Sequence, residues 1–388
     1  MNGERGAGHR GFRWIFIFMV FAVLLFSHNA GAEFGVSSNE VVLGMSNALS
    51  GPAAALGTGV KKGAMVYFNK INASGGVNGR RIKVISYDDA YEPKNTVANT
   101  QKLISQDKVF ALFGYVGTPT STSVIPLINR EKIIFFGPFT GAEFLRNPVN
   151  RYIFNVRSSY FDEAEAQVEY LTRKQGIKKI GIFIQNDAYG LAVKGGIIKA
   201  LKKRNMTIAG EGLYERNTEN IDAGFAEIKK ANPEAVSMVG TYKAMTAFIR
   251  KAKSEQFNPV FLNVSFVGTG ALIKALGAAG DGVLVTQSVP SPYDTSLQII
   301  GKYQADMKAA GYNEFDFTDL EGYIDALVFT EILKKAGQNL TRESFARAAE
   351  NLNIDASGVT FAYAPNNHQA LNKVYMTKIS GGKAVLVK

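Results

Sequence analysis

The stretches 109–121 (VFALFGYVGTPTS) and 133–141 (IIFFGPFTG) follow the same pattern. Each begins with an apolar run that predicts a buried strand, Val109–Phe113 in the first and Ile133–Phe136 in the second, and ends in a loop of Gly, Thr and Pro. In an open parallel sheet, ligands bind beyond the carboxyl ends of the strands. Backbone N–H groups and hydroxyls there, followed by a helix, suit a small anion such as a carboxylate. The two loops therefore predict a binding site.

Strand and helix patterns alternate from Val41 to about Val289, which favours an α/β fold with parallel sheets. The predicted strands are Val41–Met45, Arg81–Tyr87, Val109–Phe113, Ile133–Phe136, Ile180–Ile184, Thr207–Tyr214, Ala235–Val239, Val260–Asn263 and Val283–Gln287. The predicted helices are Leu56–Ile71, Pro93–Ser105, Asp162–Lys174, Leu191–Arg204, Ala223–Lys230 and Ala244–Glu255. These elements form two series of similar size, each sufficient for one open sheet.

The length of 388 residues exceeds what one hydrophobic core usually fills, so two lobes are expected. The last hundred residues predict helices near 297–310, 320–335 and 342–351. Strands are predicted near Thr360–Tyr363 and Lys373–Ile379, and they could complete either sheet.

The N-terminus has the pattern of an export signal. Arg5, Arg10 and Arg13 precede the apolar stretch Trp14–Phe26, and Ala30–Ala32 supplies the small-residue cleavage pattern. The stretch is short for a membrane span, which needs about 20 residues. We expect cleavage near Ala32 and a secreted chain; a retained N-terminal anchor is the alternative.

Cysteine is absent, which excludes a disulfide framework, a thiol nucleophile and a lipid-anchored cysteine. A Sec-type leader without a lipid anchor favours a Gram-negative periplasm. His368 is the only histidine after the leader, and it lies in the turn-like segment Pro365–His368. No G-x-S-x-G elbow accompanies it, so the sequence does not predict an enzyme, a metal site or a cofactor. For His368 a structural role is favoured over ligand binding.

Three other features are given ordinary structural interpretations. Gly57–Gly63 fails the spacing of nucleotide-binding loops and is interpreted as a loop entering the first helix. Asp88 and Asp89 could suggest a metal site, but a turn or capping role is favoured. The net charge of +11 comes from scattered basic pairs such as Lys178-Lys179, which argues against nucleic-acid binding.

Four segments in order carry a family likeness: 50–52 (SGP), 72–80 (NASGGVNGR), 87–89 (YDD) and 186–190 (NDAYG). Their order and spacing resemble the periplasmic leucine/isoleucine/valine-binding proteins of ABC transporters, from about Val41 to the C-terminus. The resemblance implies a type I periplasmic binding fold, α/β, with two doubly wound parallel-sheet lobes joined by a hinge of three crossovers.

The resemblance also implies an organisation and partners. Residues 1–32 would be the signal peptide, 39–158 plus 288–360 the N-terminal lobe, and 159–287 plus 361–388 the C-terminal lobe. The ligand would bind in the interlobe cleft of a monomer, and an inner-membrane permease with a cytoplasmic ATPase would recognise the closed form. The alternative is a sensor that delivers the same ligand to a membrane receptor.

For the ligand carboxylate, the resemblance implies a hydroxyl after the third strand, which Thr118 supplies. The loop after the fourth strand would offer a carbonyl and a threonine to the amino group. Phe139 and Gly141 take those positions, with Thr140 between them, so the matched hydroxyl is lost. Leu56 takes the place of an aromatic lining residue and, with Phe139 and Tyr242, predicts an apolar wall.

The ammonium half is less well matched. Tyr189 matches the tyrosine that covers the ligand, and Thr241, with Tyr242 beside it, takes the place of a second tyrosine. The glutamate that pairs with the ligand's ammonium falls at Ser265. An unpaired buried ammonium costs several kcal/mol, so an amine-free aromatic or aliphatic acid fits the sequence. An amino acid remains open if another acid, such as Asp187 or Glu143, supplies the partner.

The resemblance also implies a disulfide between the exit of the second strand and the first of the two loops quoted above. Tyr91 and Gly117 occupy the two places, so the disulfide is not expected here.

Overall fold

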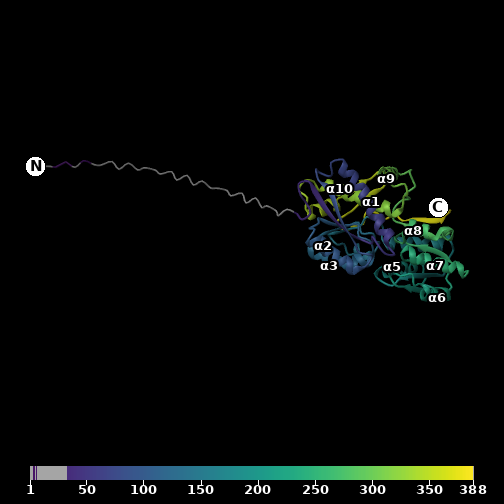
Figure 1. The fold of residues 1–388 in the computed structure, drawn as a ribbon. Helices are drawn as coiled ribbons and strands as arrows, with labels where there is room; N and C mark the ends of the chain where they lie inside the picture. Colours follow the sequence, from purple (N-terminus) through teal and green to yellow (C-terminus); the bar gives the residue numbers. More distant parts are fainter. Residues whose placement is uncertain (1–2, 5, 7–32, 388) are drawn as a thin grey trace. The chain divides into compact units, whose positions relative to one another are not determined.

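The computed structural model describes residues 3–4, 6 and 33–387. The predicted export signal therefore lies almost entirely outside the described residues. The helices of the folded body lie around two separate sheets, with α1, α2, α3 and α10 around one and α5, α6, α7 and α8 around the other (Figure 1). Across the described residues, no helix combines the length and apolarity needed to cross a bilayer.

The first sheet is parallel, with strand order β2-β1-β3-β4-β5. Its strands are β1 (Glu40–Asn47), β2 (Arg81–Asp88), β3 (Ala111–Phe113), β4 (Ile134–Phe136) and β5 (Ile153–Phe154). Its connecting helices are α1 (Ala54–Ala73), α2 (Pro93–Ser105) and α3 (Thr118–Glu131). Every residue of β3 and β4 is buried, as continuous apolar runs in a parallel sheet require. The predicted strands and helices of this series are confirmed, and β5 was not predicted.

The second sheet has strand order β14-β13-β10-β9-β8-β6-β7. Its parallel part contains β6 (Ile180–Gln185), β7 (Glu211–Tyr214), β8 (Ala235–Val239), β9 (Val260–Asn263) and β10 (Leu284–Gln287). β13 (Tyr375–Ser380) pairs antiparallel with β10, and β14 (Lys383–Leu386) pairs antiparallel with β13. The helices are α4 (Tyr160–Glu169), α5 (Ala188–Lys202), α6 (Asp222–Ala231), α7 (Tyr242–Ser254) and α8 (Thr269–Leu276). α8 and β14 were not predicted.

The chain passes between the two groups three times: from β5 to α4, from β10 to α9 (Gln298–Ala309), and from β12 (Thr360–Ala362) to β13. α9 and α10 (Phe317–Ala336) pack on α1, and α11 (Arg342–Glu350) packs on α10. The predicted strand at Thr360–Tyr363 joins neither large sheet. It pairs instead with β11 (Asn353–Asp355) as a separate two-stranded sheet.

Two sequence interpretations are corrected in detail. Gly57–Gly63 is not a loop but lies inside α1. Its Gly57 and Gly63 face neighbouring backbone, and Gly59 faces the side chains of Thr318 and Asp319. The predicted helix Asp162–Lys174 is α4 followed by a π-helical turn at Tyr170–Lys174. The α4 start is fixed by a capping box between Ser159 and Asp162.

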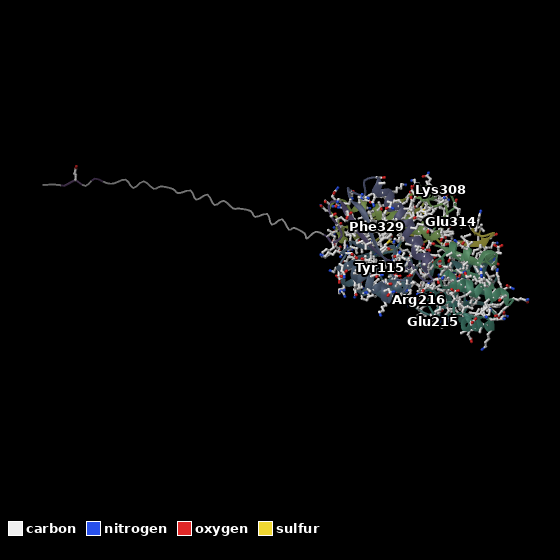
Figure 2. The ribbon with its side chains drawn as sticks, viewed as in Figure 1. Tyr115, Glu215, Arg216, Lys308, Glu314 and Phe329 are labelled. Carbon is white, nitrogen blue, oxygen red and sulfur yellow. The ribbon has the colours of Figure 1, made fainter. Side chains whose placement is uncertain are left out.

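Close contact between α1 and α10 organises the first lobe. A Cβ at Gly63 would fall inside the van der Waals radius of the Asp319 carbonyl oxygen, and one at Gly322 would overlap the Val60 carbonyl. On α10, Phe329 (labelled in Figure 2) is the centre of an aromatic cluster. Its ring centroid lies 4.8–6.4 Å from those of Phe68, Phe113, Phe136 and Phe345. The absence of side chains at these two positions therefore sets the distance between the helices.

Replacing Gly63 by alanine should force α1 and α10 apart. We expect Gly63→Ala to destabilise the fold by about 1–3 kcal/mol, the usual effect of overpacking, measured as a lower midpoint of urea unfolding. Gly301→Ala in α9 is the matched control, because no atom lies within 4 Å of a Cβ there. Equal midpoints for the two variants would contradict this account of the helix pair.

Candidate functional site

The loops after β3 and β4 bring hydroxyl groups together at the start of α3. Thr118 and Thr140 are fully buried, and their Oγ1 atoms are 2.6 Å apart. Thr140 Oγ1 also donates to the Tyr160 hydroxyl over 3.5 Å. The first turn of a helix leaves N–H groups without intrahelical partners and carries positive partial charge. The arrangement can therefore hold a carboxylate, and Thr140 supplies the hydroxyl that Gly141 lacks.

A buried cation lies directly behind this group. Arg146 Nη2 donates to the Thr140 carbonyl over 3.3 Å, and its other acceptors are also neutral: Gln369 Oε1 and the carbonyls of Ala142, Arg157 and Ser158. Among residues 33–387, no carboxylate oxygen lies within 4 Å of this guanidinium. Burial, with the nearby Arg157, lowers the pKa of Arg146 to about 10, so it stays charged at neutral pH and favours an anion nearby.

Aromatic rings from both lobes meet beside the hydroxyls. The ring of Phe266 lies 4.7 Å from Tyr189, 5.4 Å from Phe139 and 6.0 Å from Tyr91, measured between centroids. Tyr189 is fully buried, and its hydroxyl has no hydrogen-bond partner within the described part of the chain. Burial raises the pKa of Tyr189 well above its usual value, so the hydroxyl stays protonated. These rings form an apolar wall with one free hydroxyl.

The predicted residues Leu56 and Tyr242 both lie next to Gly268. A Cβ on Gly268, which has a φ of 79°, would lie 2.5 Å from the Leu56 Cδ2 and 3.8 Å from the Tyr242 Cδ1. Gly268 is thus the point where the loop before α8 approaches α1. Thr241 precedes α7 as its N-cap but makes no side-chain cap hydrogen bond.

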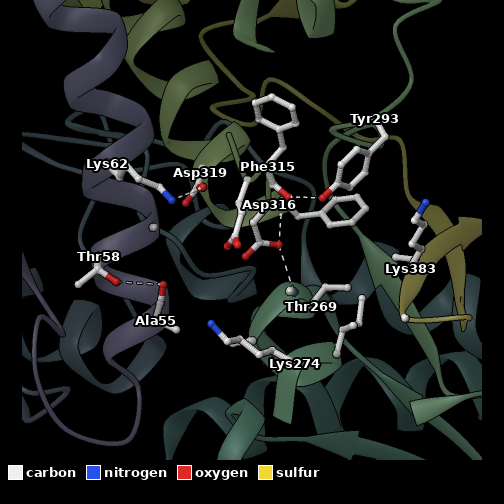
Figure 3. A pocket seen from close by; sticks show the side chains of 18 residues that line it. Ala55, Thr58, Lys62, Thr269, Lys274, Tyr293, Phe315, Asp316, Asp319 and Lys383 are labelled. Atoms are coloured by element: carbon white, nitrogen blue, oxygen red, sulfur yellow. Dashed lines mark hydrogen bonds and ion pairs between the residues drawn. The ribbon is translucent and has the colours of Figure 1, made fainter. Parts of the chain in front are cut away.

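Next to this contact a crevice of about 460 Å³ lies between α1 and α8 (Figure 3). Asp316 Oδ1 accepts from Phe317 N at 2.7 Å, at the start of α10, and from Gly270 N at 3.1 Å, in the first turn of α8. A Cβ on Gly270 would lie 2.7 Å from the Asp316 Cγ. One carboxylate therefore caps helices from both lobes.

A second contact between the lobes lies at the turn after β2. Arg216 Nη2 is 2.9 Å from Glu92 Oε2, and Arg216 Nη1 is 3.1 Å from Asp187 Oδ2. Asn217 donates to Glu92 Oε1 at 2.6 Å and to the Ala90 carbonyl at 3.1 Å. Asp187, proposed from the sequence as an ammonium partner, is thus occupied by Arg216 and by Tyr189 N at the start of α5.

Asp88 and Asp89 hold this turn, as predicted. Ala90 and Tyr91 have φ values of 52° and 63°, in the left-handed region that is unfavourable for side chains. Asp88 accepts from Ala90 N at 2.8 Å, and Asp89 accepts from Tyr91 N at 2.9 Å. The Tyr91 ring packs against Gly117, where a Cβ would overlap it. The two places of the missing disulfide are therefore neighbours in space.

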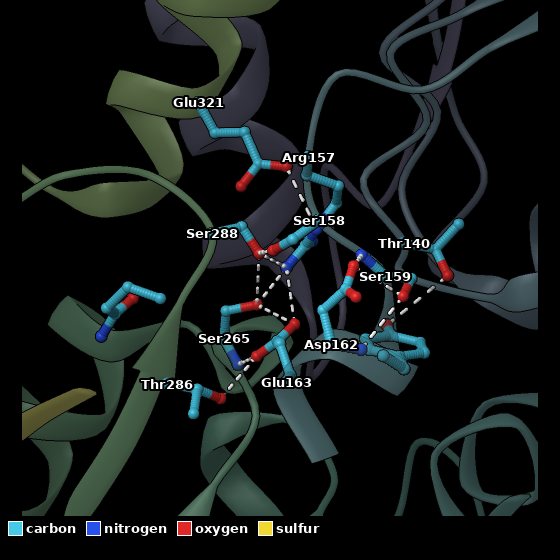
Figure 4. Close-up of polar contacts among 12 residues, drawn as sticks. Thr140, Arg157, Ser158, Ser159, Asp162, Glu163, Ser265, Thr286, Ser288 and Glu321 are labelled. Atoms are coloured by element: carbon cyan, nitrogen blue, oxygen red, sulfur yellow. Dashed lines mark hydrogen bonds and ion pairs between the residues drawn. The ribbon is translucent and has the colours of Figure 1, made fainter. Parts of the chain in front are cut away.

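A carboxylate does lie next to Ser265, but it is the side chain of Glu163 on α4. Glu163 Oε1 accepts from Ser265 Oγ at 2.8 Å (Figure 4). Its Oε2 accepts from Ser265 N at 2.8 Å and from Thr286 Oγ1 at 2.5 Å. The sequence analysis named Asp187 and Glu143 instead. No local pattern distinguishes Glu163 from its acidic neighbours on α4, so only the fold identifies it.

Arg157 is the cation paired with Glu163. Its side chain is fully buried, with Nη2 3.5 Å from Glu163 Oε1 and Nε 3.5 Å from Glu321 Oε1. Nη2 also donates to the hydroxyls of Ser265 and Ser288. Burial opposes the charge, but Glu321 and Glu163 outweigh it and raise the pKa of Arg157. Its guanidinium lies over the Phe139 ring, 4.6 Å from the centroid.

Two acids of α10 complete the buried cluster. Burial, opposed by Arg157, raises the pKa of Glu321 to about 7. Burial and Glu321 raise the pKa of Asp325 well above its usual value. Of these carboxyl groups, Glu163 is the one that contacts both Arg157 and Ser265.

Of the nine sequence-predicted residues, the structure gathers most at the lobe interface. Thr118, Thr140 and Gly141 surround Tyr160, whose backbone N donates to the Gly141 carbonyl at 2.6 Å. Phe139 and Tyr189 meet at Phe266, and Ser265 lies at Glu163. The residues that sequence reasoning missed are Arg146, Arg157, Tyr160, Glu163 and Phe266. His368 is buried and stacks on Phe154 at 4.2 Å, away from these groups.

Comparisons with known proteins find a matching family and several related proteins. The family model described as "Periplasmic binding protein" matches residues 40–384; its members are solute-binding proteins, not enzymes. The leucine-, isoleucine-, valine-, threonine- and alanine-binding protein of Pseudomonas aeruginosa is 23% identical over 84% of this chain and 89% of its own length. The leucine-specific-binding protein of Salmonella typhimurium is 24% identical over 71% and 74%, respectively.

Among solved structures, a possible leucine/isoleucine/valine-binding protein from Rhodopirellula baltica superposes with a TM-score of 0.86. It is 36% identical, and the match covers 91% of this chain and 97% of that one. The predicted α/β fold of type I periplasmic binding proteins is confirmed by this likeness.

The raised pKa of Glu321 makes stability depend on pH. The unfolded carboxyl titrates near 4.5 and the folded one at about 7, so unfolding releases a proton in between and wild-type stability falls as pH rises through this window. Glu321→Gln should remove that component. We expect its melting temperature, relative to wild type, to rise between pH 5 and pH 8.

Glu227→Gln is the control, because Glu227 is exposed and makes no ion pair within the described residues. It should keep a constant difference from wild type across the same pH range. A constant difference for Glu321→Gln as well would show that Glu321 titrates normally in the folded protein.

Proposed function

Because this chain belongs to the periplasmic binding protein family, we propose that it is the substrate-binding subunit of an ABC importer of the branched-chain amino acid type. Its ligand is a small carboxylate without an α-amino group, with an aliphatic or aromatic body. The ligand binds between the lobes, at Thr118, Thr140 and Tyr189. The two lobes correspond to 39–158 plus 288–360 and to 159–287 plus 361–388.

This proposal rests on the contacts that the Glu163 carboxylate makes. It is the buried carboxylate at Ser265, and both of its oxygens are occupied by Ser265, Thr286 and Arg157. A ligand ammonium placed there would meet a guanidinium instead of a free carboxylate. Such juxtaposition of like charges is strongly unfavourable when water is excluded. The ammonium half of an amino-acid site is therefore closed to a zwitterion.

The part of the site around Thr118 and Thr140 is suited to bind an anion. Thr118 and Thr140 place hydroxyls at the positive end of α3, and the Arg146 charge lies behind them without a carboxylate partner among the described residues. Phe139, Phe266 and Tyr189 supply an apolar wall. The relatives named above bind amino acids by their names, so this chain would keep their fold and differ in the group that neutralises the ligand.

The fold and the relatives support a role in transport. Closure of the lobes around the ligand is a hinge motion at the three crossovers, and the contacts of Asp316 and Arg216 across the lobes stabilise the closed form. An inner-membrane permease with a cytoplasmic ATPase would recognise that form. Residues 1–32 would direct the chain to the periplasm and be removed near Ala32.

The ligand class is tested with matched pairs. We expect the mature protein to melt at a higher temperature with 4-methyl-2-oxopentanoate or an aromatic acid, because a bound ligand stabilises the folded state. L-leucine, which adds an ammonium to the same carbon skeleton, should cause no shift. A shift with leucine alone would contradict the proposal and show that an ammonium partner exists.

Thr118 is tested by removing its hydroxyl. Thr118→Ala should weaken binding of 4-methyl-2-oxopentanoate at least tenfold, about 1.4 kcal/mol or more, measured by calorimetry. Thr122→Ala on the same helix is the control, because the Thr122 hydroxyl bonds only to the Thr118 carbonyl at 2.7 Å. Unchanged affinity for Thr118→Ala would remove Thr118 from the site.

A further inference from the structure

We propose that Arg157 determines which ligands this site rejects, by occupying the carboxylate of Glu163 that would otherwise pair with a ligand ammonium. The inference rests on the proposed function and adds the residue responsible for its selectivity. It predicts that the site retains a latent amino-acid specificity, which one substitution can uncover.

The first step of the argument is the position of Glu163. Ser265 holds it with both its backbone N and its hydroxyl, each at 2.8 Å. The carboxylate thus lies at the residue to which the family resemblance assigned the ammonium partner. It comes from α4 rather than from the loop after β9, so the charge is present although its expected position carries serine.

The second step is the geometry of Arg157. Arginine–carboxylate pairs frequently make two parallel hydrogen bonds. Here a single nitrogen, Nη2, approaches Glu163, at 3.5 Å, and Nε lies 3.5 Å from Glu321 Oε1. Nε and Nη1 have no hydrogen-bond partner among residues 33–387. The contact with Glu163 is therefore long and made by one nitrogen. Asp325 and Arg146 are further ionisable groups nearby.

The third step is the location of the charge. The guanidinium lies over Phe139, 4.6 Å from the ring centroid, and Phe139 packs on Phe266 at the meeting point of the lobes. A ligand held at Thr118 and Thr140 with its body against these rings would bring an α-substituent toward Arg157. A carbonyl or hydrogen is compatible with a cation there, whereas an ammonium is not.

Removing the guanidinium should therefore reverse the selectivity. In Arg157→Met, Glu163 loses its cation and a ligand ammonium can replace it. We expect affinity for L-leucine, measured by calorimetry, to rise at least tenfold above wild type, a change of about 1.4 kcal/mol, while 4-methyl-2-oxopentanoate binds no more tightly than before.

The double variant Arg157→Met with Glu163→Gln is the matched control. It keeps side chains of similar size and removes the carboxylate at Ser265, while Glu321 stays as in the single variant. Leucine binding that depends on Glu163 should therefore be lost. A single variant that folds, as shown by its circular dichroism, and still rejects leucine would overturn the inference. Loss of keto-acid binding without any gain of leucine binding would also overturn it, and would make Arg157 a direct contact of the ligand carboxylate.

If Arg157→Met does not fold, Glu163→Gln alone is used to test the inference. This substitution removes one of the two carboxylates paired with Arg157 and leaves Glu321. With the cation less fully compensated, 4-methyl-2-oxopentanoate should bind several-fold more tightly and leucine should still be rejected. Unchanged or weaker binding of the keto acid would contradict the inference. Failure of the proposed function looks different, because the wild type itself would then bind leucine.

Discussion

The buried pair of Arg157 and Glu163 is the interaction on which the arrangement of this molecule depends. Neither side chain is exposed to solvent, and removing two charges from water is costly unless each finds compensating partners. The partners come from separate parts of the chain: Ser265 follows β9, Thr286 lies on β10, Ser288 begins the second crossover, and Glu321 lies on α10. Satisfying the pair therefore requires both lobes and the crossover segments between them to be in place.

In the proposed site, such a pair would distinguish ligands that differ by a single group. Selectivity is a difference between affinities, and a repulsive element can contribute to it as well as an attractive one. The hydroxyls of Thr118 and Thr140 would recognise the carboxylate that a keto acid and an amino acid share. The charge of Arg157, which lies over the Phe139 ring, would act on the α-substituent that separates them. The two halves of the proposed site would thus perform different tasks.

The fold could be predicted largely from the sequence because buried strands and amphipathic helices leave periodic patterns. The short strands β5 and β14 were missed, as was the separate pairing of β12, because their partners are set by the tertiary fold. The predicted hydroxyl and aromatic site residues lie next to the ends of strands. Because parallel topology brings these strand ends to one edge of a sheet, the sequence alone predicts that the residues lie close together. Arg157 and Glu163 have no such signal. Each is one charged residue among many, and only burial and the approach of Ser265 distinguish them. Likewise, the serine at 265 shows the loss of a glutamate but not its replacement from α4.

The contact between Tyr91 and Gly117 has a consequence for where this chain can mature. The family resemblance places a disulfide at this junction, where the shape of the turn would depend on oxidation. Here the ring of Tyr91 rests on a residue without a side chain, and Asp88 and Asp89 fix the turn by hydrogen bonds. None of these contacts changes with redox potential, and the chain has no cysteine. The native turn is therefore equally accessible in a reducing cytoplasm and in an oxidising compartment, without an oxidoreductase or an isomerase.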